Sequence, residues 1–139
     1  MNYREVSIHD IKDLFYVRTH TDENNLSLKQ LSASGITVEA VREKLCGTHK
    51  GYLCEHNNKI IGFAIGDRKA GEMRVIAVLP EYINQGIGAK LLLMVEKWLW
   101  ESGGKQLWLE TDINPKLRAY SFYKNIGGLM IGLKTDQDI

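Results

Sequence analysis

The chain has 139 residues and a formal net charge of +1, from 18 Lys and Arg against 17 Asp and Glu. Its residues are 44% hydrophobic and 25% charged, as expected for one globular domain over residues 1–139. The near-neutral charge argues against nucleic-acid binding, which normally needs a basic surface, and the longest apolar run, residues 91–95, is far too short to cross a membrane. No signal peptide is visible, and two Cys are too few for a disulfide scaffold or a four-thiolate metal site. The four His lack metal-ligand spacing and are expected at the surface. We therefore expect a cytoplasmic protein without a metal.

Apolar spacing and turn residues divide the chain into strands and helices. In chain order we expect a strand at 3–7, a helix from 9 or 10, a loop or weak helix at 21–35, a helix at 38–46, strands at 51–55, 59–66 and 73–79, a helix from 87 to about 101, a strand at 105–111, a helix from 115 to about 125, and a strand at 129–133. Thr37 is the expected N-cap of its helix and Gly47 the stop. Asn57 and Asn58 suit a hairpin turn because Asn tolerates positive φ.

This order predicts the fold class. Three consecutive strands followed by strand–helix–strand units indicate an α/β (α+β) mixed sheet with helices on its faces. The helix from residue 87 joins the strands at 73–79 and 105–111. Such a crossover is right-handed, so we expect those two strands to be parallel.

The most informative stretch is the turn before that helix, where Gly86 and Gly88 leave the main chain uncovered by side chains. The first-turn N–H groups of a helix lack internal acceptors and carry the positive end of the helix dipole. The pattern therefore favours phosphate or diphosphate binding by main-chain amides. A tight turn without a ligand is the alternative. The spacing matches neither a Walker loop nor a full dinucleotide fingerprint.

Two separated motifs make the chain resemble the GNAT superfamily of N-acetyltransferases. The first is Val-x-Pro-x-x-(Gln/Arg)-x-x-Gly-x-(Gly/Ala) and a Leu-rich helix, matched at Val78, Pro80, Gly86, Ile87, Gly88, Leu91 and Leu92. The second is a strand, an Asn and then Ala-x-x-Phe-Tyr-x-x-x-Gly, matched within residues 107–114 and 118–127. Ile83 stands where the family has Gln or Arg, and Gly128 replaces the usual aromatic residue.

The resemblance implies a site for acetyl-CoA as co-substrate. The diphosphate would lie on the main-chain amides of Gln85, Gly86, Ile87, Gly88 and Ala89. The pantetheine arm would pair with the backbone of Ile76, Ala77 and Val78, in a gap between two parallel strands. The other side of the gap would be lined by Asn114, Tyr120 and Tyr123.

The resemblance also implies direct acetyl transfer to a primary amine within a ternary complex. Tyr123 matches the family's Tyr near the CoA sulfur, where its hydroxyl could protonate the departing thiolate; packing beside Phe122 is the alternative. Two carboxylates are candidates for the base, Glu110 at the end of one strand and Glu72 at the start of another. Either could instead be an exposed strand-end carboxylate.

The acceptor is left open, as a small-molecule amine, a peptide N-terminus or a lysine. The family usually adds a seventh strand, which this chain lacks, so we expect a second copy of the chain to cover the bare sheet edge in a homodimer. Two interpretations from other classes remain. One is a non-catalytic acyl-CoA-binding or regulatory module on the same fold, and the other is a nucleotide-phosphate binder whose Gly loop only mimics the motif.

Overall fold

The computed structural model describes residues 1–21, 27–102, 107–110 and 131–134, which contain both helices and strands. The elements in chain order are β1 (Asn2–Glu5), the 3-10 turn η1 (Ile8–Asp10), α1 (Ile11–Thr19), α2 (Leu28–Ala33), α3 (Val38–Cys46), β2 (His49–His56), β3 (Lys59–Asp67), β4 (Glu72–Val78), the 3-10 turn η2 (Pro80–Tyr82), α4 (Ile87–Glu101), β5 (Leu107–Glu110) and β6 (Ile131–Lys134). The helix expected from residue 115 lies outside the described residues. None of the described helices is long and apolar enough to cross a membrane.

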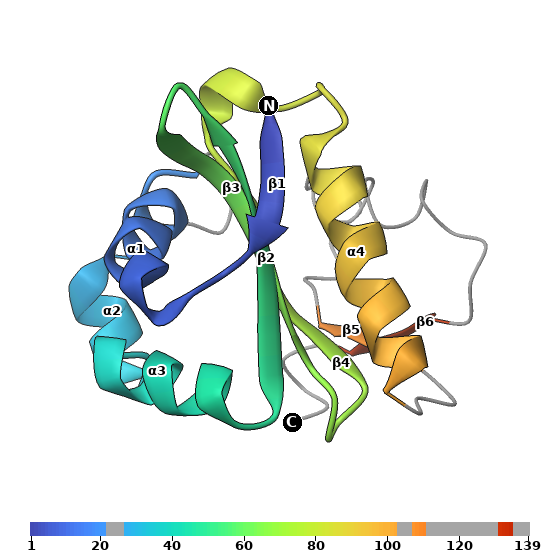
Figure 1. Cartoon of the computed structure of the whole chain (residues 1–139). Coiled ribbons are helices and arrows are strands. Elements are labelled where there is room, and N and C mark those ends of the chain that lie inside the picture. The colour runs from blue at the N-terminus through green and yellow to red at the C-terminus, as the bar shows by residue number, and fades with distance from the viewer. Residues whose placement is uncertain (22–26, 103–106, 111–130, 135–139) are drawn as a thin grey trace.

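The described strands form one sheet in the order β1-β2-β3-β4-β5-β6. Neighbours from β1 to β4 are antiparallel, whereas β4 and β5, and β5 and β6, are parallel. Figure 1 shows α1, α2 and α3 on one side of this sheet and α4 on the other. The predictions of a mixed sheet with helices on its faces and of a parallel β4–β5 pair are therefore confirmed.

The β2–β3 hairpin closes at the turn that its two asparagines predict. Asn57 and Asn58 have φ values of 52° and 62°. His56 pairs with Lys59 across the turn. Two consecutive positive φ angles match the right-handed twist of the flanking strands, and Asn adopts them at low cost.

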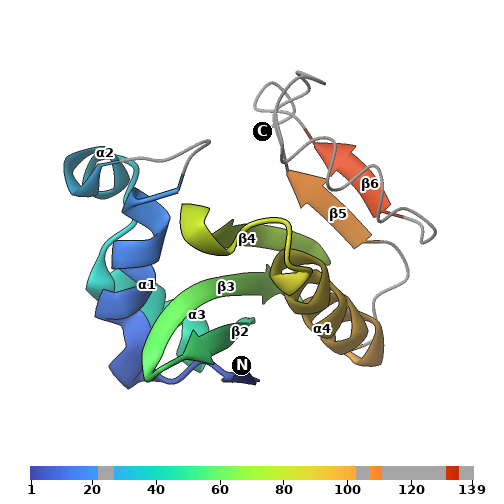
Figure 2. The ribbon, with the colours of Figure 1, turned by 90° about the horizontal axis from the view of Figure 1, so that it is seen from above.

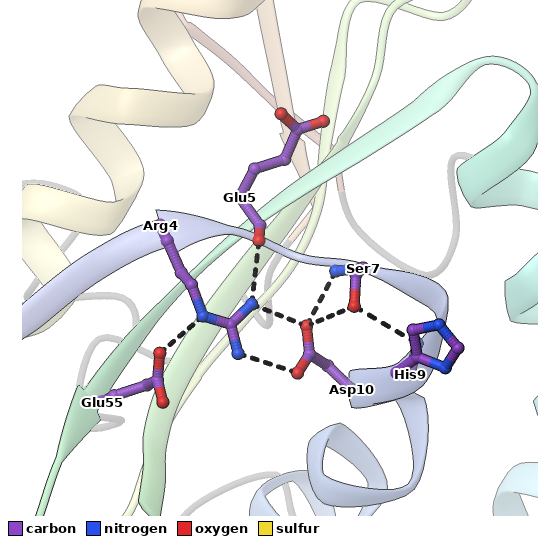
Figure 3. Close-up of polar contacts among 6 residues, drawn as sticks. All are labelled: Arg4, Glu5, Ser7, His9, Asp10 and Glu55. Atoms are coloured by element: carbon purple, nitrogen blue, oxygen red, sulfur yellow. Dashed lines mark hydrogen bonds and ion pairs between the residues drawn. The ribbon is translucent and has the colours of Figure 1, made fainter. Parts of the chain in front are cut away.

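A polar network ties the start of the chain to β2 (Figure 3). The guanidinium of Arg4 donates to both carboxylate oxygens of Asp10, at 2.8 and 2.9 Å, and its Nε donates to Glu55 at 2.5 Å. Asp10 also accepts from the main-chain N–H of Ser7 at 2.8 Å, and the Ser7 hydroxyl accepts from the N–H of His9, which completes a capping box. The first helical turn therefore begins at a Ser7 cap, slightly before the predicted start.

Helix α4 packs closely on β3 because β3 carries glycine where the helix approaches. A Cβ added to Gly66 would lie 2.5 Å from Val95 Cγ1 and 3.5 Å from Leu99 Cδ1. The apolar face of α4 that points into the core consists of Ile87, Leu91, Leu92, Val95 and Leu99. This packing fixes the axis of α4, and with it the position of the helix's first turn.

Candidate functional site

The loop before α4 holds its glycine in a conformation that other residues adopt at a cost. Gly86 has φ 81° and ψ 4°, in the left-handed region, and caps the helix. A Cβ at this position would meet nothing within 4 Å, so the main chain here faces open space. Ile87 follows at 1% exposure and anchors the loop in the core. The loop is thus both rigidly seated and open on its outer side.

Three main-chain amides at this helix start lack an intrahelical acceptor. The first helical bond runs from Lys90 N to Gly86 O at 3.1 Å, so the N–H groups of Ile87, Gly88 and Ala89 precede it. No side chain caps the helix, and its first turn contains no acidic residue. The positive end of the dipole is therefore not neutralised by a carboxylate there, which suits an anionic ligand. Gln85 and Gly86, also predicted to bind, are exposed.

Sequence reasoning missed a lysine contact near the start of this helix. Lys90 Nζ lies 4.1 Å from the ring centroid of Tyr3, which comes from β1. A lysine in the first helical turn opposes the helix dipole, and a bound anion would offset that cost. The available signal was a Lys where helices usually place Asp or Glu. Its contact with Tyr3 depends on the tertiary fold.

The strand that leads into the loop separates from its parallel neighbour. Within the described residues, β4 pairs with β5 only at Glu72 and Met73, whereas its pairing with β3 continues to Val78. Figure 2 shows β5 veering away from β4 beyond the paired ends. The later part of β4 therefore has an edge on this side without pairing to β5.

A β-bulge accounts for the separation. Ile65 and Gly66 of β3 face Val75 and Met73 of β4, so Arg74 is an extra residue in β4. A bulge bends its strand and disrupts the local ladder. Because the bulge follows Met73 directly, β4 turns away from β5 where their pairing stops.

The free edge of β4 offers main-chain groups at alternate residues. Leu79 N donates to Ile61 O at 2.9 Å, so Leu79 and, two residues earlier, Ala77 direct their main-chain groups to β3. Ile76 and Val78 direct theirs to the opposite edge, toward the gap. Of the three residues predicted to bind pantetheine, these two have the orientation to do so. Ala77, at 6% exposure, contributes packing instead.

Glu72 is buried and paired at the closed end of the gap. Its side chain is 4% exposed, and its Oε1 accepts from Arg74 Nη1 at 2.8 Å. A base at this position would take up a proton while held by that guanidinium. Glu110, the other candidate base, ends β5 in register with Lys134. The remaining predicted residues, Asn114, Tyr120 and Tyr123, lie outside the described residues.

The described part of the chain contains no cluster of three or more His, Cys, Asp or Glu that could hold a metal ion. Within the described residues, the site consists of main-chain donors at the start of α4, an edge of β4 that is not paired to β5, and the buried Glu72 carboxylate held by the exposed Arg74 on β4. Such a set can hold a ligand with a diphosphate at one end and amide groups along its length.

This combination defines an acyl-CoA-dependent acyltransferase fold, and the family comparison agrees. Residues 7–127 match the model of the acetyltransferase (GNAT) family. The chain belongs to that family, which classes it as an acyltransferase. No curated protein matches the chain by sequence.

Solved structures with the same fold include three acetyltransferases. The PaiA N-acetyltransferase of Thermoplasma acidophilum, in complex with coenzyme A, is 20% identical over 90% of this chain and 89% of that chain, with a TM-score of 0.72. The ribosomal-protein-S18-alanine N-acetyltransferase of Escherichia coli is 20% identical over 91% and 76%, with a TM-score of 0.70. AAC(6')-Iy, in complex with a CoA bisubstrate analog of acetylneamine, is 14% identical over 92% and 90%, also with a TM-score of 0.70. At these identities the likeness concerns the fold.

Proposed function

We propose that the chain transfers an acetyl group from acetyl-CoA to a primary amine. The observation that carries the proposal is the alignment of two sets of free main-chain groups on one strand–loop–helix unit. The N–H groups of Ile87, Gly88 and Ala89 suit the diphosphate, with the exposed Gln85 and Gly86 beside them. The outward main chain of Ile76 and Val78 suits the amides of the pantetheine arm.

The transfer would proceed directly between two bound substrates. The amine nitrogen bonds to the acetyl carbon, the carbon–sulfur bond breaks, and the thiolate leaves. The motif resemblance supports Tyr123 as the acid that protonates that thiolate, and Glu110 or Glu72 is the candidate to receive the proton that the amine loses. This chemistry needs no covalent enzyme intermediate.

Gly86→Val tests the binding loop. We expect CoA affinity to fall at least tenfold in calorimetry, because the side chain would project over the amides and strain the left-handed turn. Gly35→Val is a matched control, since Gly35 also has φ 81° and nothing within 4 Å of its Cβ position, but lies after α2. Each variant should lose about 1–2 kcal/mol of stability. Equal CoA affinities for the two variants would contradict the proposed loop.

Ligand binding and a thiol-release assay together distinguish acetyl transfer from the two alternative functions. An acetyl-CoA-dependent thiol-release screen over polyamines, amino acids, aminoglycosides and N-terminal peptides should find an acceptor. Tight CoA binding without thiol release would favour a regulatory acyl-CoA-binding module. Binding of ATP but not of CoA would favour a nucleotide-phosphate binder.

Tyr123→Phe tests the acid. Removal of the hydroxyl should lower turnover by about 10²-fold or more while acetyl-CoA affinity stays nearly unchanged. Steady-state rates with the best acceptor of the screen, together with calorimetry, measure both quantities. An unchanged rate would remove Tyr123 from this role.

The acceptor, the cellular compartment and the assembly belong to the same proposal. The acceptor class covers small-molecule amines, peptide N-termini and lysines, and two of the similar structures are named for an aminoglycoside analog and a ribosomal-protein alanine. A cytoplasmic location accords with the free thiols of Cys46 and Cys54. A homodimer that covers the sheet edge stays a prediction.

A further inference from the structure

A cavity of about 300 Å³ lies at the far end of α4 from the Gly86 loop. Its walls come from the end of β1, the start of β2, the β3–β4 loop and the last turn of α4, including Glu5, His49, Lys50, Arg68, Trp98 and Ser102. The 15 residues of α4 span about 22 Å. Figure 1 shows the two ends of this helix at opposite ends of the molecule, so the cavity is separate from the proposed CoA site.

The cavity exposes an open stretch of sheet edge. The last bond between the β1 segment and β2 runs from Val6 N to Gly51 O at 2.8 Å, whereas β2 begins two residues earlier, at His49. Thr48 O accepts from Arg68 N at 3.0 Å, on the opposite, β3 side. Because main-chain groups alternate along a strand, the N–H and C=O of His49 face the same side as those of Gly51. They therefore point into the space where β1 does not continue.

Two cations border this open edge against one carboxylate. Lys50 Nζ lies 3.7 Å from Glu5 Oε1 and 5.7 Å from the ring centroid of Trp98. Arg68 donates to Gly47 O at the long distance of 3.5 Å. The Trp98 carbonyl, at the end of α4, already accepts from the N–H and hydroxyl of Ser102. Among the residues that line the cavity, the formal charge is +1, and Arg68 is the cation without a carboxylate contact in the described part of the chain.

His49 corrects the expectation that all four histidines lie at the surface. Its side chain is 10% exposed, and burial lowers its pKa. The ring contacts Thr48 Oγ1 at 2.9 Å and lies 3.8 Å from Asp67. His49 therefore contributes main-chain groups to the cavity, while Lys50 and Arg68 supply the charge.

We propose that this cavity binds the carboxyl-terminal residues of an extended peptide. The peptide main chain would pair with β2 beside His49, in line with β1, and its terminal carboxylate would meet Lys50 and Arg68. Open sheet edges bind extended chains through main-chain hydrogen bonds, and neighbouring charge selects the terminus. The volume is at the lower limit of ligand cavities, which fits a chain end better than a long segment. The proposal is independent of the proposed acetyl transfer.

NMR titration of the ¹⁵N-labelled full chain tests the site. The probe is N-acetyl-trialanine with a free carboxylate, and its C-terminal amide is the matched ligand. We expect the acid to shift the amide signals of His49 and Gly51 and to bind at least fivefold more tightly than the amide. Arg68→Gln should weaken binding of the acid at least fivefold. Lys97→Gln, which removes a cation 80% exposed on α4, should leave it unchanged.

Several results would overturn the proposal. These are equal binding of acid and amide, shifts centred on the Gly86 loop, no shifts at all, or equal losses in Arg68→Gln and Lys97→Gln. If the spectrum of Arg68→Gln shows loss of fold, Lys50→Gln replaces it with the same expected loss. CoA titrated into the same samples distinguishes the two proposals, because a chain that binds CoA but no peptide contradicts this one alone.

Discussion

At the scale of single residues, Glu96 is the position most at odds with its surroundings. Its side chain is 3% exposed on the core-facing side of α4, and neither carboxylate oxygen has a hydrogen-bond partner. Burial raises the pKa of Glu96, and the Trp100 indole N–H, which does not meet hydrogen-bond geometry with the carboxylate, opposes that rise only in part. A buried acid without partners costs free energy that an apolar residue of similar size would not.

Glu96→Leu should therefore stabilise the protein by about 1–3 kcal/mol near pH 7. The raised pKa means that the native state holds a proton which the unfolded state releases, so stability falls as pH rises through the window above the ordinary Glu value. Glu96→Gln should remove this pH dependence. Urea unfolding across pH 4–8 measures both effects. Glu101→Gln, 64% exposed, is the control, and an equal response in the two Gln variants would refute the explanation.

The pKa of Asp10 is shifted in the opposite direction, so its effect on stability has the opposite dependence on pH. Its bonds to Arg4, with those to Ser7, lower the pKa of Asp10 to about 2 despite partial burial. The ionised Asp10 carboxylate therefore stabilises the folded state fully at pH values above the ordinary Asp pKa of about 3.9, and this contribution is lost as the pH falls toward 2. Asp10→Asn should cost about 1–3 kcal/mol at pH 7 and flatten the acid limb of the stability curve. Asp13→Asn, at an exposed site in α1, should do neither in the same unfolding measurements.

At the scale of elements, the contact of α4 with β3 determines where the amide donors lie. Gly66→Ala would place a Cβ 2.5 Å from Val95 Cγ1, so the helix or strand must shift. We expect a loss of about 1–3 kcal/mol in urea unfolding, with weaker CoA binding as the first turn moves. Adding Val95→Ala should restore part of both. If the stability loss of the double variant equals the sum of the losses of the two single variants, overpacking is not the cause.

Elements that carry their own signals were predictable from the residues, whereas the gap between β4 and β5 was expected only from the family resemblance. Thr37 accepts from Ala40 N as the expected N-cap, and the Asn57-Asn58 turn formed as its residues indicate. The bulge at Arg74 is different, because it depends on how many residues β3 places opposite β4. A periodic pattern within one strand carries no information on that count.

At the scale of the whole molecule, the candidate site also contains some features that local sequence predicts and others that depend on the tertiary fold. The loop amides come from one strand–loop–helix segment, so local sequence was sufficient to predict them, whereas the pantetheine-binding edge of β4 was expected only from the family resemblance. The contacts of Lys90 with Tyr3 and of Glu72 with Arg74 were not predicted. The first joins residues from β1 and α4, so it arises only when the tertiary fold has assembled. The second joins residues two positions apart in β4, where strand geometry places alternate side chains on one face.

The order of strands in the sheet has a consequence for how the chain reaches its native state. β2, β3 and β4 are consecutive in sequence and neighbours in space, so they can pair with little loop-closure entropy. β1 must instead close a loop of about fifty residues to reach β2, since Arg4 and Glu55 are 51 positions apart. We infer that the three-strand meander forms the folding nucleus and that the N-terminal strand docks onto it afterwards. Loss of the Arg4 contacts would then speed unfolding and leave the refolding rate nearly unchanged.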